Sequence, residues 1–457
     1  MHTASSQQCF PGLVEQDDAE FEPFEGGITS EAVDAAYNLL APSAKVGARD
    51  QVRVILRSNT FFVHQRNDTD LTRGRPQYAR PRTAQAHRRP DSSWPLSAAF
   101  ARMCGSPLVL QLLKLLCSSP GGLPDADAVF NAGDYGLVSA DKPTASGSTT
   151  PPPVWSFAKQ PAAHRDLWYP YWSTLWLEDE KLKSAVVATP WDQKAPRLVW
   201  RGSQTGNPPT SASSWQRNPW QTHRWRYTTR GQLVRRCANL SDAICDAGFH
   251  RWAPWVSEGV RREIEGESGA LRPRLEWAEM QRNRYVALVD GEGGTSASRS
   301  VREFGEGTAT FKTESPASEF WYALLRPFVH YVPLSASLED LEGRLEWARS
   351  NDALVRRISQ EAAGLKRRQL TDEHILCYMR TRWRRYAGLL RFSPSVRRAS
   401  ACAPTGGACR VPFRRLKVLP TLAQKLRKYV VRHNLSSSHE WCLAVLRNHS
   451  RHPEQVL

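Results

Sequence analysis

The sequence predicts an α/β protein built mainly on parallel strands, and three observations lead to this prediction. From about residue 195 onward, strand-like and helix-like segments alternate at a spacing of about 20–30 residues, which is typical of a doubly wound sheet. The segments 196–209 and 284–307 each begin as a strand and continue into a glycine-bearing loop. Apolar residues make up 40% of the 457 residues, which is enough to bury cores in two or three domains of ordinary size.

The first half of the chain carries weaker signals. Residues 1–30 are rich in acidic side chains, and we expect them to form a loose leader. We then expect a short helix at 30–40, capped by Ser30, and a strand segment at 51–65. A basic polar loop at 66–94 and a second helix at 96–117 should follow. A buried strand over 128–131 ends in a Gly-Asp-Tyr-Gly loop. This half is compatible with a second sheet.

The second half gives clearer elements. We expect strands near 196–203, 284–289, 308–315 and 328–334, and helices over 338–370 and 372–390. The resulting domain prediction has four parts. They are the leader 1–30, an α/β domain 31–195 with loops at 66–94 and 139–153, a Rossmann-like domain 196–395, and a basic extension 396–457.

The charge is uneven along the chain. The formal net charge is +17, and residues 361–432 hold 18 Lys and Arg against three acidic residues. No RNP, zinc-finger or helix-turn-helix signature accompanies this excess, so the sequence does not favour a nucleic-acid partner. The basic stretch is either a solvated face or a peripheral contact for anionic membrane or glycan. The apolar run Pro107–Cys117 is far shorter than a membrane span, and no signal peptide is visible.

The nine cysteines form no CxxC or Cys/His metal pattern, so no metal site is expected. The spacings Cys237–Cys245 and Cys402–Cys409 suit short disulfide loops, and the odd total leaves at least one thiol unpaired. Composition alone does not decide the compartment.

Two loops have the composition of phosphate-binding sites. In the first, a strand is followed by residues 291–298 (GEGGTSAS) and Arg299; glycine amides, hydroxyls and a guanidinium all suit a diphosphate. In the second, Arg201 and Gly202 follow a strand in WRGSQTG, at the edge where open α/β sheets bind ligands. The alternative for each loop is an ordinary turn between elements.

Asp134 lies at the end of the predicted strand 128–131, between small residues in FNAGDYG. A carboxylate in that position suits a general base. The alternative is an aspartate that only forms the turn.

Taken together, several motifs resemble glycosyltransferase family 90, which includes Rumi-type protein O-glucosyltransferases and capsule-associated xylosyltransferases. The resemblance covers about residues 120–390 and is strongest over 308–360. The motifs, in chain order, are LPDADAVFNAGDYG, PVWSFAK, DLWYPYW, WRGSQTG, YVALVDGEGGTSASR and FKTESPASEFWYALLRPFVHYVP.

The resemblance implies a GT-B-like architecture with two Rossmann-like domains that face a cleft. It implies an inverting, metal-independent glycosyltransferase without a cofactor. Such an enzyme would move glucose or xylose from a UDP-sugar to a protein or glycan hydroxyl in the endoplasmic reticulum or Golgi lumen. Asp134 would be the catalytic base. The expected donor-binding residues are Arg201, Gly202, Ser203, Gly293, Gly294, Thr295, Ser296, Ser298, Arg299 and Glu319, and the expected acceptor-binding residues are Asp166, Trp168 and Tyr169.

Some of these assignments have plain structural alternatives. Trp168 and Tyr169 could belong to the core, Asp166 could form a structural salt bridge, and Lys312 reads as a solvated lysine at a strand end. The sequence also departs from the family pattern. Gly136 stands where the family usually has proline, and the loop 291–298 looks longer than usual. A catalytically impaired, sugar- or nucleotide-binding relative therefore remains the alternative function.

Overall fold

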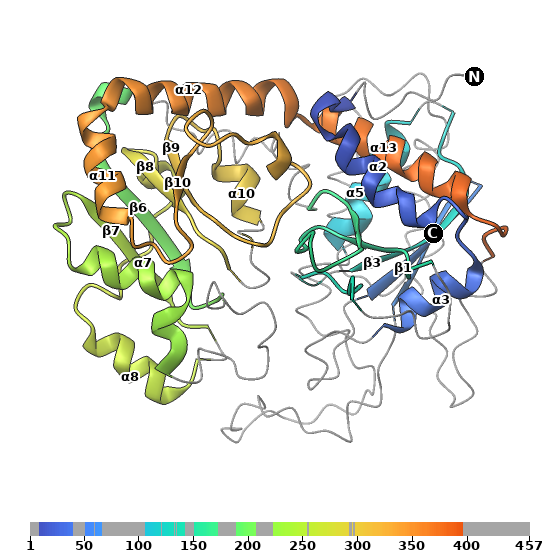
Figure 1. Ribbon diagram of the computed structural model, residues 1–457, viewed down its shortest axis with the longest axis horizontal. Coiled ribbons are helices and arrows are strands. Elements are labelled where there is room, and N and C mark those ends of the chain that lie inside the picture. The colour runs from blue at the N-terminus through green and yellow to red at the C-terminus, as the bar shows by residue number, and fades with distance from the viewer. Residues whose placement is uncertain are drawn as a thin grey trace, which may run out of the picture. The chain divides into compact units, whose positions relative to one another are not determined.

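The structure is a computed structural model of the 457-residue chain. It describes residues 9–39, 51–58, 60–65, 106–119, 121–131, 133, 135–141, 150–171, 189–206, 223–253, 256–291, 295 and 298–395. These residues form two five-stranded sheets with helices packed against them (Figure 1). The α/β prediction is therefore confirmed.

The first sheet is mixed rather than parallel. Its strands are β1 (Gln51–Arg57), β2 (Thr60–Gln65), β3 (Ala126–Asn131), β4 (Val154–Ser156) and β5 (Leu167–Trp168), in the order β2-β1-β3-β4-β5. Strand β1 is antiparallel to both β2 and β3, and β3 is parallel to β4. The hairpin β1–β2 is the predicted segment 51–65, which turns back at Ser58 with a φ of 48°. Helix α3 (Ser30–Asn38) packs on β1 and β3, and helix α5 (Ser106–Cys117) lies between β2 and β3 in the chain.

The second sheet is fully parallel, as predicted for the second half. It comprises β6 (Ala195–Ser203), β7 (Cys245–Arg251), β8 (Asn283–Leu288), β9 (Ala309–Thr313) and β10 (Val332–Leu334), in the order β10-β9-β8-β6-β7. Strands β6 and β8, which precede the two predicted donor loops, are neighbours. Their carboxyl ends therefore meet at one edge of the sheet.

The helices associated with the second sheet follow the predicted alternation. They are α7 (Thr229–Ala238), α8 (Glu258–Gly266), α9 (Trp277–Met280), α10 (Ser298–Glu303), α11 (Leu341–Ser350) and α12 (Asp352–Gln369). Helix α13 (Asp372–Leu389) matches the last predicted helix. The helical region predicted over 338–370 consists of two helices, because Asn351 leaves the helical conformation between α11 and α12. The short 3-10 segments are Pro11–Leu13, Glu22–Phe24, Trp191–Gln193, His223–Tyr227 and Tyr322–Leu324.

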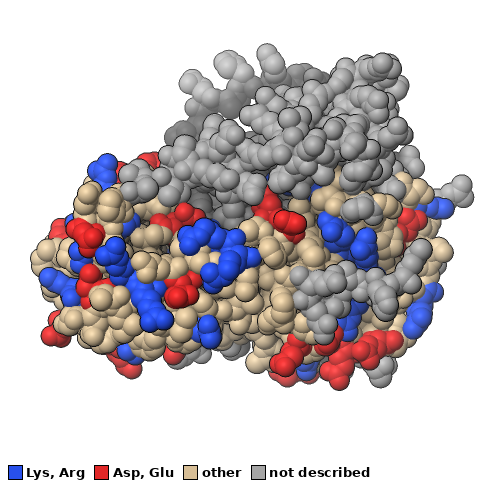
Figure 2. All heavy atoms as spheres, turned by 90° about the horizontal axis from the view of Figure 1, so that it is seen from above, with Lys and Arg blue, Asp and Glu red and all other residues tan. Residues whose placement is uncertain are grey.

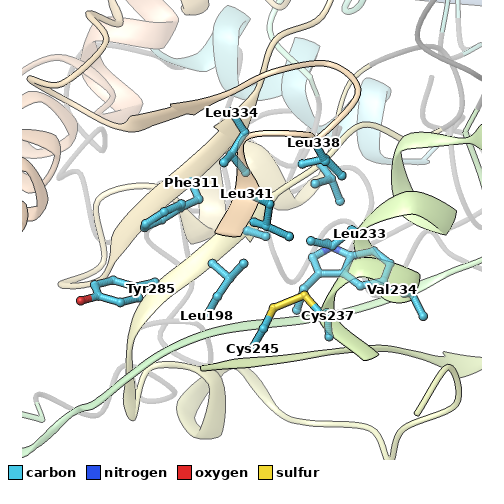
Figure 3. Packing of buried hydrophobic residues seen from close by; sticks show 14 of the residues in the cluster. Leu198, Leu233, Val234, Cys237, Cys245, Tyr285, Phe311, Leu334, Leu338 and Leu341 are labelled. Carbon is cyan, nitrogen blue, oxygen red and sulfur yellow. A yellow bond between two sulfur atoms is a disulfide. The ribbon is translucent and has the colours of Figure 1, made fainter. Parts of the chain in front are cut away.

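The strands of the second sheet are buried on both faces. Along β6, Leu198 and Trp200 join one apolar cluster, whereas Val199 faces the opposite way into a smaller cluster with Met280 and Val286. Figure 3 shows the larger cluster from close by, with side chains from β6, β8, β9 and β10 beside α7 and its disulfide between Cys237 and Cys245. Because both faces are filled, polar chemistry is confined to the strand ends.

The N-terminal residues are not a loose leader where the structure describes them. Residues Val14–Phe21 form helix α2, and the flanking Phe10, Leu13 and Phe24 are buried. Cys9 is bonded to Cys377. The acidic composition misled the prediction, because the buried positions Leu13, Asp17 and Phe21 recur every four residues as on one face of a helix, and one of them is itself acidic.

The chain divides into two compact units whose boundaries differ from the predicted domains. One unit comprises Met1–Glu20, Gly133–Lys142 and Ser156–Cys377, and the other comprises Phe21–Ala132, Pro143–Trp155 and Tyr378–Leu457. The segment after Ser156 joins the unit of the parallel sheet, where Lys159 pairs with Ser318 in a β-bridge. Helix α13 instead packs with the first sheet, where Tyr386 donates a hydrogen bond to the Asp127 carbonyl. Neither link is visible in local sequence patterns.

The basic side chains of 361–395 are partly used inside the protein. Lys366 pairs with Glu306, and Arg382 lies buried against the rings of Phe21 and Tyr378. On the face in Figure 2, basic and acidic side chains are interspersed among the described residues. The predicted contact with anionic membrane or glycan stays a prediction, and its residues 396–432 lie outside the described part. No described helix is both long enough and apolar enough to cross a membrane.

Candidate functional site

The two predicted donor loops lie beside each other at the carboxyl edge of the parallel sheet. The loop after β6 approaches the loop after β8 so closely that a Cβ on Gly206 would lie 3.2 Å from the Asp290 carbonyl oxygen. Gly206 has a φ of 99°, which favours glycine. The Gly291 amide donates to the Thr295 carbonyl at 2.9 Å and closes the second loop. The structure thus brings together the two segments that the sequence singled out.

Several predicted donor-binding residues fall outside what the structure describes. Gly293, Gly294 and Ser296 are not among the described residues, and of Ser298 and Arg299 only the helical backbone in α10 is described. Thr295 is buried, as is Gly202, whose added Cβ would collide with the Trp200 ring. Asp134 also lies outside the described residues. The roles of these residues stay predictions.

Arg201 is held by the protein around it. Its Nε donates to the Pro273 carbonyl, its Nη1 donates to two carbonyls including that of Asp246, and its Nη2 pairs with the Asp246 carboxylate at 2.8 Å. Burial lowers the pKa of Arg201 and the neighbouring carboxylate opposes this effect. At least four of its five N–H donors thus have partners in the protein. These contacts give Arg201 a structural role, and its contact with a donor phosphate stays a prediction.

A second arginine, which the sequence analysis missed, joins the two donor loops. Arg230 lies in the first turn of α7. Its Nε donates to the Asp290 carbonyl, after β8, at 2.9 Å. Its Nη1 donates to the Ser203 carbonyl, at the end of β6, at 3.1 Å and to the Thr205 hydroxyl. Its guanidinium lies 5.6 Å from the centroid of the Trp200 ring. The sequence signal was the helix start at Thr228 and Thr229, which marks the position of Arg230 but not its partners.

A buried group of charged residues lies next to these loops. Burial raises the pKa of Asp290 from 3.8 to about 6, while Lys312, Ser315 and Arg230 oppose the shift. Lys312, on β9, is only 9% exposed, and burial lowers its pKa. Its Nζ lies 4.5 Å from the centroid of the Tyr322 ring and donates to the Thr313 carbonyl. The expectation of a solvated strand-end lysine is therefore wrong, because Asp290 and Glu319 supply compensating charge in the interior.

Glu319 is fixed by three donors. Its Oε1 accepts from the Ser300 hydroxyl at 2.8 Å and the Tyr322 hydroxyl at 3.3 Å, and its Oε2 accepts from the Trp321 indole at 3.2 Å. Burial raises the pKa of Glu319 from 4.5 to about 7, against these hydrogen bonds and Lys312. Carboxyls with raised pKa values are common in functional sites. The predicted contact of Glu319 with the donor ribose stays a prediction.

The predicted acceptor-binding residues lie together, but they are buried. Asp166 is 0% exposed, and the rings of Trp168 and Tyr169 are each 2% exposed. The Lys159 ammonium lies 4.7 Å from the centroid of the Trp168 ring, and Tyr169 packs edge-on against Phe157. These contacts match the core-packing alternative for the two aromatic residues. Their contact with an acceptor stays a prediction.

Asp166 binds the segment that follows Asp134. Its Oδ1 accepts from the Leu137 amide at 2.9 Å and the Ser156 hydroxyl at 2.6 Å, and its Oδ2 accepts from the Val138 amide at 2.9 Å. Burial raises the pKa of Asp166, and the three donors and Lys159 oppose that shift. The salt-bridge alternative is replaced by this set of hydrogen bonds, because Lys159 instead pairs with Glu20 and donates to the backbone carbonyl of Asp166.

The packing of His164 explains why a glycine occupies position 136. A Cβ at this position would lie 2.5 Å from Cγ of His164, which is closer than any side-chain carbon can approach. The chain therefore fills the space beside Gly136 with the ring of His164.

Among the described residues, no group of three or more His, Cys, Asp and Glu side chains could hold a metal ion. One of the two short disulfide loops expected from spacing, Cys237–Cys245, is confirmed; Cys402–Cys409 lies outside the described residues.

Comparison with known proteins decides the family. A family model described as glycosyl transferase family 90 matches residues 100–411, more than half of the chain. This chain belongs to glycosyl transferase family 90. The resemblance inferred from the motifs is thereby confirmed.

The family 90 chain is similar to curated proteins at modest identity. It is 27% identical over 289 residues to O-glucosyltransferase rumi of Drosophila pseudoobscura pseudoobscura, covering 59% of this chain and 62% of that protein. It is 24% identical over 296 residues to protein O-glucosyltransferase 1 of Homo sapiens, covering 61% of this chain and 66% of that protein. The match thus spans less than two thirds of the length of either relative.

One similar solved structure is that of Anabaena Alr3699/HepE in complex with UDP. The identity is 10% and the TM-score is 0.32, covering 50% of this chain and 63% of that chain. This likeness is too slight to support an argument about the family 90 chain.

Proposed function

We propose that this chain is an inverting, metal-independent glycosyltransferase that moves glucose or xylose from a UDP-sugar to a hydroxyl of a protein or glycan. The observation that carries the proposal is the family 90 match, which includes Asp134, Arg201 and Arg299 in one continuous region. The names of the two relatives favour glucose as the sugar and protein as the acceptor. The adjacent loops after β6 and β8 support a donor site at that sheet edge.

In the proposed reaction, an acceptor hydroxyl oxygen forms a bond with the anomeric carbon while the bond from that carbon to the UDP oxygen breaks. Asp134 takes the proton of the attacking hydroxyl as a general base. One in-line displacement inverts the configuration at the anomeric carbon. UDP leaves with the pair of electrons from the broken bond, so the site must stabilise a growing negative charge.

Positive charge and N–H donors are the means of stabilisation that this chain offers. Arg299 and the backbone amides of 291–298 are the proposed contacts for the departing diphosphate. Arg230 supports this proposal indirectly, because it holds the loops after β6 and β8 in contact through the Ser203 and Asp290 carbonyls. No divalent cation is part of the proposal. The buried carboxyl of Glu319 is the proposed partner of the donor ribose.

The alternative, a catalytically impaired binding relative, was motivated by Gly136 and the loop 291–298. The contact of Gly136 with His164 weakens the first reason, because the local packing requires glycine at that position. Measurable turnover of a UDP-sugar distinguishes the two functions, since a binding relative would retain UDP affinity without turnover.

The test is a panel of UDP-sugars with the purified chain, scored by release of UDP. We expect UDP-glucose or UDP-xylose to be hydrolysed or transferred, and Asp134→Asn to lower kcat with little effect on UDP affinity. Arg299→Ala should lower kcat by about 10²–10³-fold, the usual effect of losing one preorganised donor to a developing charge. Full turnover by Asp134→Asn would remove that residue from the mechanism.

The proposed compartment is the lumen of the endoplasmic reticulum or Golgi. The disulfides Cys9–Cys377 and Cys237–Cys245 support it, because disulfides persist mainly in oxidising compartments.

A further inference from the structure

The segment that follows Asp134 is held along its length by the segment before Trp168. The Arg165 amide donates to the Val138 carbonyl and the Ala140 amide donates to the Ala163 carbonyl, each at 2.8 Å. Ser139 and His164 form an antiparallel bridge. Both segments belong to the same compact unit. Backbone pairing therefore fixes the chain from Val138 onward.

Asp166 extends this pairing toward Asp134. The backbone pairing between the two segments ends at Val138. The amides of Leu137 and Val138 donate to the Asp166 carboxylate and not to a backbone carbonyl. The Ser156 hydroxyl donates to the same carboxylate. Only Tyr135 and Gly136 separate the bound Leu137 from Asp134, so at most about 10 Å of extended chain joins Leu137 to Asp134.

The backbone around Asp166 is held as well. Lys159, which is 4% exposed, donates to the Asp166 backbone carbonyl and pairs with Glu20. Glu20 also accepts from the Trp168 amide at 3.2 Å. The backbone at Asp166 and at Trp168 is therefore fixed by side-chain contacts. Asp166 is fully buried, so it offers no exposed surface to an acceptor.

We propose that Asp166 is a positioning residue for sugar transfer, which acts through the Leu137 and Val138 amides to fix the backbone that carries Asp134. The proposal rests on the proposed function, in which Asp134 accepts the proton of the attacking hydroxyl. Asp166 exchanges no proton with the substrate. Its effect is geometric, because a displacement of about 1 Å in a catalytic group can cost about 10²-fold in rate.

The test variant is Asp166→Asn, which keeps the shape of the side chain but turns one acceptor oxygen into an NH₂ donor. That donor would face an amide or hydroxyl that also donates, so one of the three bonds is lost. We expect kcat for transfer to fall by about 10–10²-fold. The KM for the UDP-sugar and the Kd for UDP should change little, because Asp134 acts on the acceptor. Ser156→Ala removes one bond and should give a smaller loss of kcat.

The matched control is Arg165→Ala. Arg165 is adjacent and exposed, and its backbone amide keeps the bond to Val138 after the substitution. It should leave kcat, KM and UDP affinity unchanged. Hydrogen exchange supplies a readout independent of activity: the amides of Leu137 and Val138 should exchange faster in Asp166→Asn, while those of β8 keep the wild-type rate.

The outcomes separate this inference from the proposed function. Wild-type kcat in Asp166→Asn would overturn the inference alone. Loss of kcat and of UDP binding in the same proportion, with faster exchange throughout the parallel sheet, would also overturn it, since that result describes a purely structural residue. A wild-type chain that binds UDP but transfers no sugar would reject the proposed function and, with it, a positioning role in transfer.

Discussion

At the residue scale, burial sets the protonation of two carboxyls. The pKa of Asp290 is raised to about 6 and that of Glu319 to about 7, both chiefly by burial. A carboxyl whose pKa is higher in the folded than in the unfolded state stabilises the fold at low pH. That contribution is complete below the unfolded pKa and is lost as the pH rises through the folded one.

Glu319→Gln should therefore flatten the pH dependence of stability. In the wild-type chain, we expect the free energy of unfolding to fall between pH 5 and pH 7 as Glu319 loses its proton, by at most about 3 kcal/mol. Glutamine does not titrate, so the variant should show a smaller fall, with the remainder coming from groups such as Asp290. Urea unfolding at pH 5, 6, 7 and 8 measures the difference. Parallel curves for the two proteins would contradict the raised pKa of Glu319.

The arginines show how far residue types can be interpreted from sequence. WRGSQTG marked a loop that lies beside the loop after β8, but its Arg201 binds Asp246, which lies on a neighbouring strand 45 positions away. Arg230 has no glycine-rich context, yet it contacts both donor loops. The sequence indicates which strand a loop follows. The partners of a long side chain depend on the order of the strands in the sheet, which the sequence does not indicate.

At the element scale, one buried ion pair joins β1 to β3. The Arg53 guanidinium binds Asp127 through Nε–Oδ1 at 2.7 Å and Nη2–Oδ2 at 2.6 Å, and Asp127 is 0% exposed. The second carboxylate partner of Arg53 is Asp34 of α3, whose side chain is 50% exposed. The same cation thus has one buried and one half-exposed carboxylate.

Asp127→Asn and Asp34→Asn form a matched pair of tests. Asp127→Asn leaves a buried cation without its bidentate partner, which should cost about 3–5 kcal/mol of unfolding free energy. Asp34→Asn should cost only about 0–1 kcal/mol, because water compensates for the lost charge. Urea unfolding of the two variants and the wild type measures both losses of unfolding free energy. Equal losses would mean that burial of the pair does not govern its contribution.

Composition and periodicity predict elements unequally. The alternation after residue 195 predicted four of the five parallel strands, because strands buried on both faces are short, continuous apolar segments. Strand β7 (Cys245–Arg251) was not predicted. Helix α2 was missed, since most of its residues are acidic or polar and one of its two buried residues, Asp17, is itself acidic. The break at Asn351 was missed as well, because α11 and α12 have similar composition and no proline marks the end of the first.

At the scale of the whole molecule, sequence could not assign segments to compact units. Residues 133–142 and 156–171 were predicted with the first domain, but they fall in the compact unit that contains the parallel sheet, although β5 among them is a strand of the mixed sheet. Most of α13 falls in the other unit. Such grouping depends on long-range contacts such as Lys159 with Ser318 and Trp383 with the Pro124 carbonyl. These contacts join distant positions and leave no periodic pattern.

The two described disulfides close loops of very different length, which allows a test at this scale. Cys9 and Cys377 are 368 positions apart, whereas Cys237 and Cys245 are 8 apart. If a disulfide stabilises mainly by restricting the unfolded chain, Cys9→Ala/Cys377→Ala should lose about 3 kcal/mol more unfolding free energy than Cys237→Ala/Cys245→Ala, since the restriction grows with the logarithm of loop length.

The comparison also separates two sources of the effect. Cys9, Cys237 and Cys245 are buried and Cys377 is half-buried, so the two double alanine variants lose packing of similar size. Urea unfolding of the oxidised wild type, the fully reduced wild type and the two variants gives the four free energies needed. A smaller loss for the long loop than for the short one would show that the unfolded chain keeps residues 9 and 377 close without the bond. The entropic account would then fail for this chain, and the N-terminal segment would owe its place to contacts such as that between Phe10 and Phe320.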